Sequence, residues 1–262
     1  LLSAASVQGM DFDSAIVAAA VQAGTEDNAE DVETRLERLE REHALVRFVG
    51  ELEAPDRSLT LRYRFAHHMY QNACFESLRA TRKAALGRAI AERMAARDGE
   101  QSDRLADIAV LFEVARDGVR AAEYWNRAAQ AAGRLYAHDE SARLAERGLA
   151  LLAREPASPE RSAAELGLLM TYALAIKTSK GYAIAEVGRA YERARELSRQ
   201  VDDPSRVIPV LIGMSAHHMV AGDIRIAHDI SLEMMALFER LGDPHLQMIG
   251  EWSVGAALFH LG

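Results

Sequence analysis

The spacing of apolar residues predicts a repeated pair of helices in the second half of the chain. Apolar side chains recur every three or four residues in 183–200 and again in 224–241, and this spacing places them on one face of an α-helix. Each segment runs into an Asp-Pro pair, and the two pairs are 40 residues apart, at 203–204 and 243–244. The residue before a proline rarely adopts a helical conformation, whereas proline itself is favoured in the first turn of a helix. We therefore expect a second helix to begin at each of these prolines. The apolar positions are Ile184, Val187, Ala190, Tyr191, Ala194 and Leu197, then Ala227, Ile230, Met234, Leu237 and Leu241.

The unit of about 40 residues is therefore helix, turn, helix, turn, with Gly222-Asp223 as the internal break. One such hairpin cannot bury both faces alone, so the pattern predicts a solenoid of stacked hairpins. It resembles the tetratricopeptide class without following its strict consensus. Small residues would let its helices approach closely. Less regular patterns predict helices at 104–116, 119–136, 139–153 and 160–177 with a polar loop at 154–162, and the small residues are Ala128, Ala145, Ala190 and Ala227.

The first hundred residues show a different pattern, in which helices precede two short strands. Helices are expected at 1–7, 13–23 and 32–46, followed by alternating segments at 45–51 and 59–65 that predict strands. Two more helical segments follow, at 67–78 and 79–97, and the third helix has a narrow apolar seam of Val32, Leu36, Leu39 and Val46. This is the element order of a winged helix. The fold expected is mainly α: a winged-helix-like domain with a small β-wing at 1–98, then tetratricopeptide-like repeats at 99–262.

A winged helix suggests DNA binding, but the charge of the third helix argues against it. Residues 31–42 contain five acidic residues and three arginines, and the whole chain has a net charge of −8. Affinity for DNA depends on cationic contacts with phosphate, so a helix of net negative charge is poorly suited to the major groove. The basic stretch at 79–97 is scattered around its helix and is interpreted as a solvated face. We therefore do not expect nucleic acid to be a partner.

Composition indicates a globular protein without a membrane segment. The chain is 49% hydrophobic and 27% charged, and its longest apolar run, 15–21, is far shorter than the roughly 20 residues of a membrane span. With Cys74 as the sole cysteine, a cytoplasmic location is expected. The chain has no initiator methionine and stops within a repeat at Gly262. We therefore expect a piece of a longer protein, whose open repeat end exposes apolar surface and can self-associate.

Motifs for catalysis or metal binding are missing from the sequence. It has neither a phosphate-binding Gly-x4-Gly-Lys-Ser/Thr loop nor a His-Glu-x-x-His zinc helix. The adjacent pairs His67-His68 and His217-His218 suit packing better than chelation, since neighbouring helical residues point about 100° apart. Cys74 is expected to be a buried thiol, and Trp125 and Trp252 core residues. We expect no enzyme activity, no cofactor and no metal within this segment.

Several stretches resemble a segment of bacterial signal-transduction ATPases of the STAND class. These are "LLSAASVQGMDFDSAIVAAAV", "LERLEREHALVRF", "YRFAHHMYQNACFESLRATRKAALGRAIAERM" and the repeat region from Thr178 onward. They are similar to the region after the nucleotide-binding core in cyclase-associated ATPases and in maltose-activator-type regulators. The resemblance implies an ATPase core upstream in cis, which binds ATP or ADP, then a winged helix and helical repeats. It also implies that the concave face of the repeats binds a protein or a small effector.

The resemblance also assigns a role to one histidine. The family's Phe-x-His pattern, where the second wing strand enters a helix, is matched by Phe65-Ala66-His67. In related switch ATPases this histidine contacts the phosphates of bound ADP and stabilises the inactive state, which suits a donor at a helix N-terminus. By resemblance His67 is the nucleotide-state sensor; alternatively it only caps or packs the corner. The family's later Arg-x-x-Leu-His is not matched, because Gly87 stands at the histidine position.

Three functions remain open on the sequence. The first is a regulatory segment of a larger ATPase switch, in which the repeats bind an effector and the winged helix relays that state to the nucleotide site. The second is a repeat scaffold that binds one protein partner, and the third is a fragment of a DNA-binding regulator.

Overall fold

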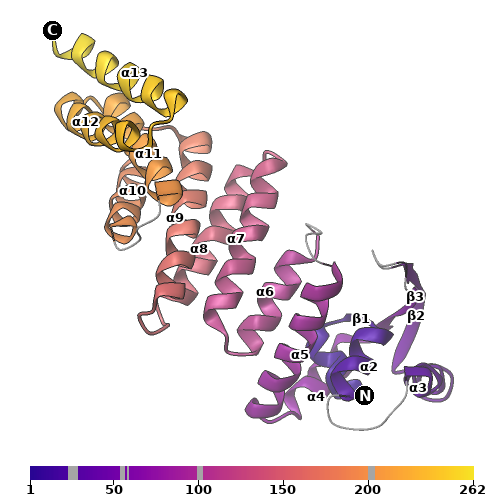
Figure 1. Ribbon diagram of the computed structural model, residues 1–262. Coiled ribbons are helices and arrows are strands. Elements are labelled where there is room, and N and C mark those ends of the chain that lie inside the picture. Colours follow the sequence, from indigo (N-terminus) through magenta and orange to yellow (C-terminus); the bar gives the residue numbers. More distant parts are fainter. Residues whose placement is uncertain (23–28, 54–56, 58, 99–102, 200–203) are drawn as a thin grey trace. The chain divides into compact units, whose positions relative to one another are not determined.

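The computed structural model of the chain is mainly helical, with one small sheet (Figure 1). It describes residues 1–22, 29–53, 57, 59–98, 103–199 and 204–262. The chain forms two compact units, Leu1–Tyr124 and Trp125–Gly262. The expected mainly α class with a small sheet is confirmed. The expected domain boundary at residues 98/99 borders the stretch 99–102, which lies outside the described residues.

The described elements follow the order of the sequence prediction, with one addition. The first unit contains α1 (Leu2–Gln8), β1 (Asp11–Asp13), α2 (Ser14–Gln22), α3 (Ala29–His43), β2 (Val46–Glu53), β3 (Leu59–Phe65), α4 (His68–Glu76), α5 (Ala80–Asp98), α6 (Leu105–Val114) and the first part of α7 (Gly118–Arg134). The second contains the rest of α7, α8 (His138–Leu152), α9 (Pro159–Lys180), α10 (Ala185–Ser198), α11 (Pro204–Ala221), α12 (Ile224–Leu241) and α13 (Pro244–Leu261).

The sheet has three strands in the order β1-β3-β2, and both pairings are antiparallel. β3 is central and alternates, with Tyr63 and Phe65 buried, and Phe12 of β1 packs against Phe65 with ring centroids 5.3 Å apart. A bulge between Phe48 and Gly50 interrupts the register of β2. The prediction of two strands was incomplete, because β1 has three residues and alternation cannot be recognised over so short a run.

The third helix begins and ends three residues earlier than predicted, over Ala29–His43 instead of 32–46. α3 ends at His43, and Ala44 has a left-handed backbone with φ 51°. This conformation ends the helix, with the Ala44 N–H donating to the Glu40 carbonyl and the Leu45 N–H to that of Leu39. Val46 was assigned to the helical seam, but it begins β2 and is buried there.

Gly87 has a packing role that the sequence comparison did not suggest. A Cβ at this position would lie 3.0 Å from the Leu111 carbonyl oxygen and 3.1 Å from a methyl group of Val114. Glycine therefore allows α5 to pack closely against the end of α6. The basic stretch on α5 is solvated at most positions, but the Arg97 side chain is only 10% exposed and pairs with Asp13, so the interpretation as a solvated face was wrong for Arg97.

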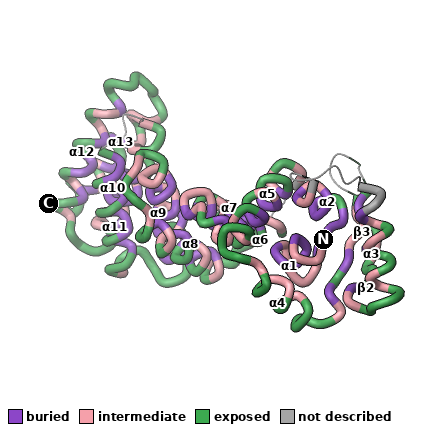
Figure 2. Tube along the Cα trace, turned by 90° about the horizontal axis from the view of Figure 1, so that it is seen from below, coloured by how far each residue is buried: buried purple, intermediate pink, exposed green. Residues whose placement is uncertain are grey.

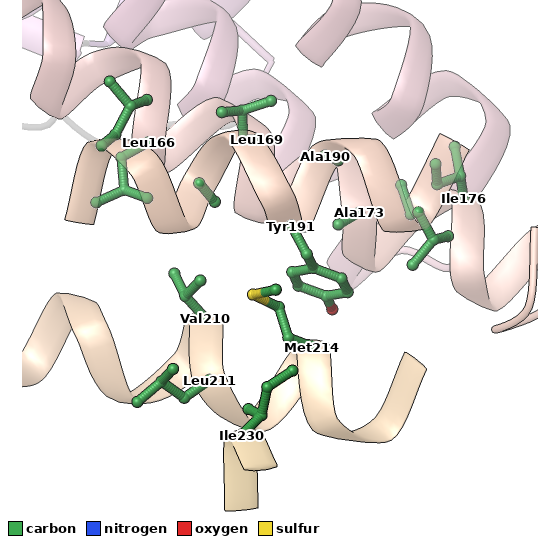
Figure 3. Packing of buried hydrophobic residues seen from close by; sticks show 14 of the residues in the cluster. Leu166, Leu169, Ala173, Ile176, Ala190, Tyr191, Val210, Leu211, Met214 and Ile230 are labelled. Carbon is green, nitrogen blue, oxygen red and sulfur yellow. The ribbon is translucent and has the colours of Figure 1, made fainter. Parts of the chain in front are cut away.

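In the second unit, α8 to α13 each pack against the next helix along the chain. Buried and exposed stretches alternate along these helices (Figure 2). Helices start at Pro204 and Pro244 as predicted, and the Asp243 side chain caps α13 by accepting from the N–H groups of His245 and Leu246. In the core, Tyr191 lies beside Met214 (Figure 3). The small residues expected at close helix contacts are buried: Ala128, Ala145, Ala190 and Ala227.

A ring of three serines joins α11, α12 and α13. The side-chain oxygens of Ser215, Ser231 and Ser253 lie 2.7–3.0 Å apart, and Ser231 also lies within bonding distance of the Ala227 carbonyl. All three serines are buried. Buried hydroxyls without partners are costly, so this ring favours the one alignment of the three helices that satisfies all of them.

An ion pair on the sheet predicts a pH-dependent contribution to stability. Arg64 donates to both carboxylate oxygens of Asp11, at 2.5 and 2.8 Å, and these bonds hold the pKa of Asp11 below its usual value. The stabilisation is complete above the unfolded-state pKa near 3.8 and is lost as the pH falls through the lower folded-state pKa. We therefore expect the urea midpoints of the wild type and Asp11→Asn to differ at pH 7 and to approach each other as the pH falls below 3.8. A difference that is constant over this range would contradict the prediction.

Candidate functional site

His67 occupies the corner where β3 meets α4. The strand end is held by two backbone bonds: the Phe65 N–H donates to the Met10 carbonyl and the Ala66 N–H to that of Leu45, both at 2.9 Å. His67 itself is extended, with φ −148° and ψ 144°, and is the N-cap of α4. The sheet therefore fixes the position at which this side chain leaves the backbone.

The capping contact determines which ring nitrogen of His67 carries the proton. Nδ1 accepts a hydrogen bond from the Met69 N–H at 3.1 Å. An accepting nitrogen has no proton of its own, so in the neutral ring the proton is on Nε2. No described residue bonds to Nε2, and the side chain is exposed. The corner thus offers one N–H donor beside a helix N-terminus, where anions are favoured.

The neighbours of His67 are also exposed. The His67 ring lies 4.7 Å from the His68 ring and 6.4 Å from that of Tyr70, and Met69 is solvent-exposed too. The expectation that the His67-His68 pair packs in a core or groove was therefore wrong. Both rings remain accessible because α4 buries none of its residues.

The acidic residues of α3 form hydrogen bonds and an ion pair within the first unit, and they surround this helix with a negative potential. Glu33 accepts from the Ser14 hydroxyl at 3.0 Å, Glu40 accepts from the Phe48 N–H at 2.8 Å, and Glu37 pairs with Arg41. Burial raises the pKa of the Tyr63 hydroxyl, and the charges of Glu40, Glu37 and Glu33 add to the rise. The helix that would enter a DNA groove therefore has a net negative charge, and this charge also creates a negative potential at the neighbouring Tyr63.

The second unit contains a groove of about 820 Å³, lined by residues of α7 to α11. Its apolar lining includes Met170, Leu174 and Ile212, and Leu174 is 55% exposed. Its charged lining consists of Arg134 and Lys177, which meet there from α7 and α9. Sequence reasoning did not identify these residues. The only local signal was an apolar side chain, Leu174, outside the buried face of its helix.

A smaller cavity of about 210 Å³ lies between α11, α12 and α13 and is lined in part by Trp252. Trp252 is 75% exposed, so its expected place in the core was wrong. Trp125, by contrast, is buried as predicted, beneath the guanidinium of Arg147. Helical spacing alone could not distinguish these two tryptophans, because only the helices packed around each one decide its burial.

The remaining candidate residues are held in structural contacts. His217 is buried and its Nδ1 lies 2.6 Å from the Tyr182 carbonyl oxygen, while Nδ1 of His218 lies 3.2 Å from an Asp223 carboxylate oxygen. Cys74 is half-buried, not fully buried as expected, and burial raises the pKa of its thiol. A raised pKa keeps the thiol protonated and therefore a poor nucleophile.

Among the described residues, no group of three or more His, Cys, Asp or Glu side chains is arranged to hold a metal ion. None of the described helices is long and apolar enough to cross a membrane. A scan of family models and a search of curated proteins both found no match for this chain.

Proposed function

We propose that this chain is the regulatory segment of a larger signal-transduction ATPase of the STAND class. In this proposal α1 to β3, with the trailing helices α4 and α5, form a winged-helix-like domain, and α6 to α13 form tetratricopeptide-like repeats that bind an effector or a protein. The winged helix passes the bound state of the repeats to a nucleotide-binding core that precedes it in the same protein. ATP and ADP are ligands of that core and not of the segment itself.

The order of elements in the first unit supports the winged-helix part of the proposal. A short strand follows the first helix, two further helices come next, and a hairpin of β2 and β3 adds to that strand in the order β1-β3-β2. A central β3 flanked by β1 and the wing strand β2 is the sheet arrangement of winged-helix domains. The 40-residue spacing of Pro204 and Pro244, each of which starts a helix, supports the repeat interpretation of the second unit.

The observation that carries the proposal is the geometry of His67. Its Nδ1 is used by the cap, and its Nε2–H remains accessible at the start of α4. A phosphate group near this corner would meet an imidazole donor and the N-terminal end of a helix together. A histidine with a purely capping role would leave Nε2 without a function.

We predict that His67→Asn weakens ADP retention in the protein expressed from its complete gene. Asparagine is a good N-cap, so the variant keeps the helix start but loses the imidazole donor. A hydrogen bond to a charged group contributes about 1.5–3 kcal/mol, so we expect ADP affinity to fall by about tenfold or more. Basal ATPase or output activity should rise. Isothermal titration with ADP and a nucleotide-release assay measure both effects.

His68→Asn is the matched control, because His68 is also an exposed histidine and lies one residue further along. It should leave ADP affinity unchanged, and thermal unfolding should show that both variants are folded. Unchanged ADP affinity in His67→Asn would make the corner structural. The scaffold function would then become the better hypothesis.

One observation favours that second function, a scaffold that binds a protein partner. α13 exposes large apolar side chains, among them Met248, Trp252 and Phe259. Exposed apolar patches of this kind mark association surfaces, and this one also supports self-association through the last helix. The third function, DNA binding, has less support because residues 31–42, most of α3, have a net negative charge.

A further inference from the structure

The groove of the second unit combines features that together define a ligand class. Its volume of about 820 Å³ is within the range of pockets for small molecules. Its walls are apolar at Met170, Leu174 and Ile212. Leu174 is more than half exposed although it is a leucine, so a bound apolar group would remove its surface from water.

One polar group of the groove lining, the Thr171 hydroxyl, already has hydrogen-bond partners in the protein. Thr171, with Gly167 beside it, is called the floor of the groove. The Thr171 hydroxyl lies 2.7 Å from Oδ1 of Asn126 and 3.1 Å from the Gly167 carbonyl, and Gln130 lies 3.4 Å away on its other side. A polar ligand would therefore find little to bond with at this point. The floor suits an apolar body better than a sugar or a polar peptide backbone.

The charged residues of the groove are all cationic or able to become so. Arg134, Lys177 and His138 line it, and none of its described lining residues is Asp or Glu. Within the described part of the chain, Arg134 and Lys177 make no ion pair; the Lys177 ammonium instead lies 5.1 Å from the Tyr182 ring centre. Both cations lie in the last turns of their helices, where the helix dipole favours them. Their convergence on one apolar groove is nevertheless unusual in a chain with 39 acidic and 31 basic residues.

A phenolic hydroxyl adds a neutral donor to the same wall. Tyr191 lines the groove, and burial raises its pKa to about 12. A tyrosine hydroxyl is protonated at neutral pH even without this rise, and that of Tyr191 has no hydrogen-bond partner among the described residues. It can donate to a ligand that lies between α9 and α11.

We infer that this groove binds a small anionic amphiphile, with its apolar body on α9 and α11 and its carboxylate or phosphate head between Arg134 and Lys177. This inference rests on the proposed function, because it assigns the effector site of the repeats to these residues. An acidic peptide is the less favoured occupant, since the floor offers few free polar groups for a peptide backbone.

The test is calorimetric titration of the 262-residue chain with dodecanoate and with dodecyl phosphate, below their micellar concentrations. We expect one binding site. Dodecyltrimethylammonium, which has the same apolar body and the opposite charge, should bind at least about tenfold more weakly if the head lies between two cations. Lys177→Glu and Arg134→Glu should each weaken dodecanoate by about tenfold, on the same reasoning. A preference between dodecanoate and dodecyl phosphate identifies the type of head group.

Two further variants keep the test specific. Gly133→Leu fills the groove from α7, and its Cβ would lie 3.5 Å from the Ser141 hydroxyl oxygen, an ordinary contact. It should abolish binding without lowering the melting temperature, because leucine also favours the helix over glycine. Arg225→Glu, an exposed arginine on α12 outside the groove lining, should leave binding unchanged.

The inference is overturned if the cationic amphiphile binds as tightly as dodecanoate, or if binding survives Gly133→Leu. It is also overturned if neither amphiphile binds while an oligoglutamate peptide does, since the site would then be a peptide groove. These titrations use no nucleotide, so their failure is independent of the result for His67→Asn. Equally, a failure of the ADP experiment leaves the ligand class of the groove intact.

Discussion

Replacing Asp13 with asparagine is expected to lower the free energy of unfolding by about 3–5 kcal/mol, the cost of breaking a buried ion pair from one side. The Asp13 side chain is 1% exposed, and one of its oxygens lies 2.8 Å from Nη2 of Arg97 and 3.5 Å from Nη2 of Arg104. Both arginine side chains are also nearly buried, at 10% and 12% exposure. The variant keeps the shape of the side chain but leaves two buried cations without their shared carboxylate.

The chain contains its own control for this prediction. Asp11 is two residues away on the same strand and also pairs with an arginine, but the Arg64 side chain is 57% exposed. Water can replace that partner, so Asp11→Asn should cost clearly less. Equal losses in the two variants would show that burial of the Asp13 pair contributes nothing.

Fluorescence and circular dichroism together can follow the unfolding of the two units separately. Both tryptophans, Trp125 and Trp252, belong to the second unit. Tryptophan fluorescence therefore follows the unfolding of that unit, whereas circular dichroism follows the helices of both. If the units unfold separately, Asp13→Asn should move only the transition that fluorescence does not detect. If they unfold together, both signals should move to the same extent.

Replacing Gly213 with alanine is expected to destabilise the second unit by about 1–3 kcal/mol, the usual cost of overpacking. An added Cβ would lie 2.3–2.6 Å from three atoms of the Tyr191 side chain. Although the ring borders the groove on one side, Tyr191 is 3% exposed and belongs to the core of the second unit, so moving the ring away from the added Cβ disturbs that packing. The direction of this stability change is informative, because Gly→Ala within a helix ordinarily stabilises the protein by about 0.5–1 kcal/mol.

Gly255→Ala is the matched control for this change. Gly255 is in the interior of α13, and a Cβ there meets nothing within 4 Å. It should therefore raise the urea midpoint, while Gly213→Ala lowers it, both followed by tryptophan fluorescence. Adding Tyr191→Ala should remove most of the extra penalty of Gly213→Ala, as a double-mutant cycle detects for residues in contact. A stabilising Gly213→Ala would contradict the packing of Tyr191 against α11.

Most helices could be predicted from the sequence because their signals are local. The apolar spacing of 183–200 and 224–241 and the prolines at 204 and 244 are all read within one or two turns. The same spacing correctly predicted which faces are buried, since Val187, Ala194 and Met234 all lie in the core. The exception at Leu241, which is 42% exposed, comes at the end of α12, where Phe238 takes the buried position.

The candidate sites show the same contrast between residues with a local sequence signal and residues without one. His67 was identified because Phe65-Ala66-His67 is a contiguous pattern, and its place at a strand-to-helix corner follows from the neighbouring segments. The groove was not identified, since Arg134 and Lys177 are 43 residues apart and line one groove only in the folded chain.

The sequence by itself determined the helical class, the positions of most helices and the 40-residue offset between Pro204 and Pro244. Only the tertiary structure decided that Arg97 pairs with the buried Asp13, that Gly213 makes room for Tyr191, and that Trp252 is exposed although Trp125 is not. The physical reason is that helix formation depends on interactions within a few residues. Burial and ion pairing instead depend on which distant segments come into contact in the folded chain. A local sequence pattern contains no information about these contacts.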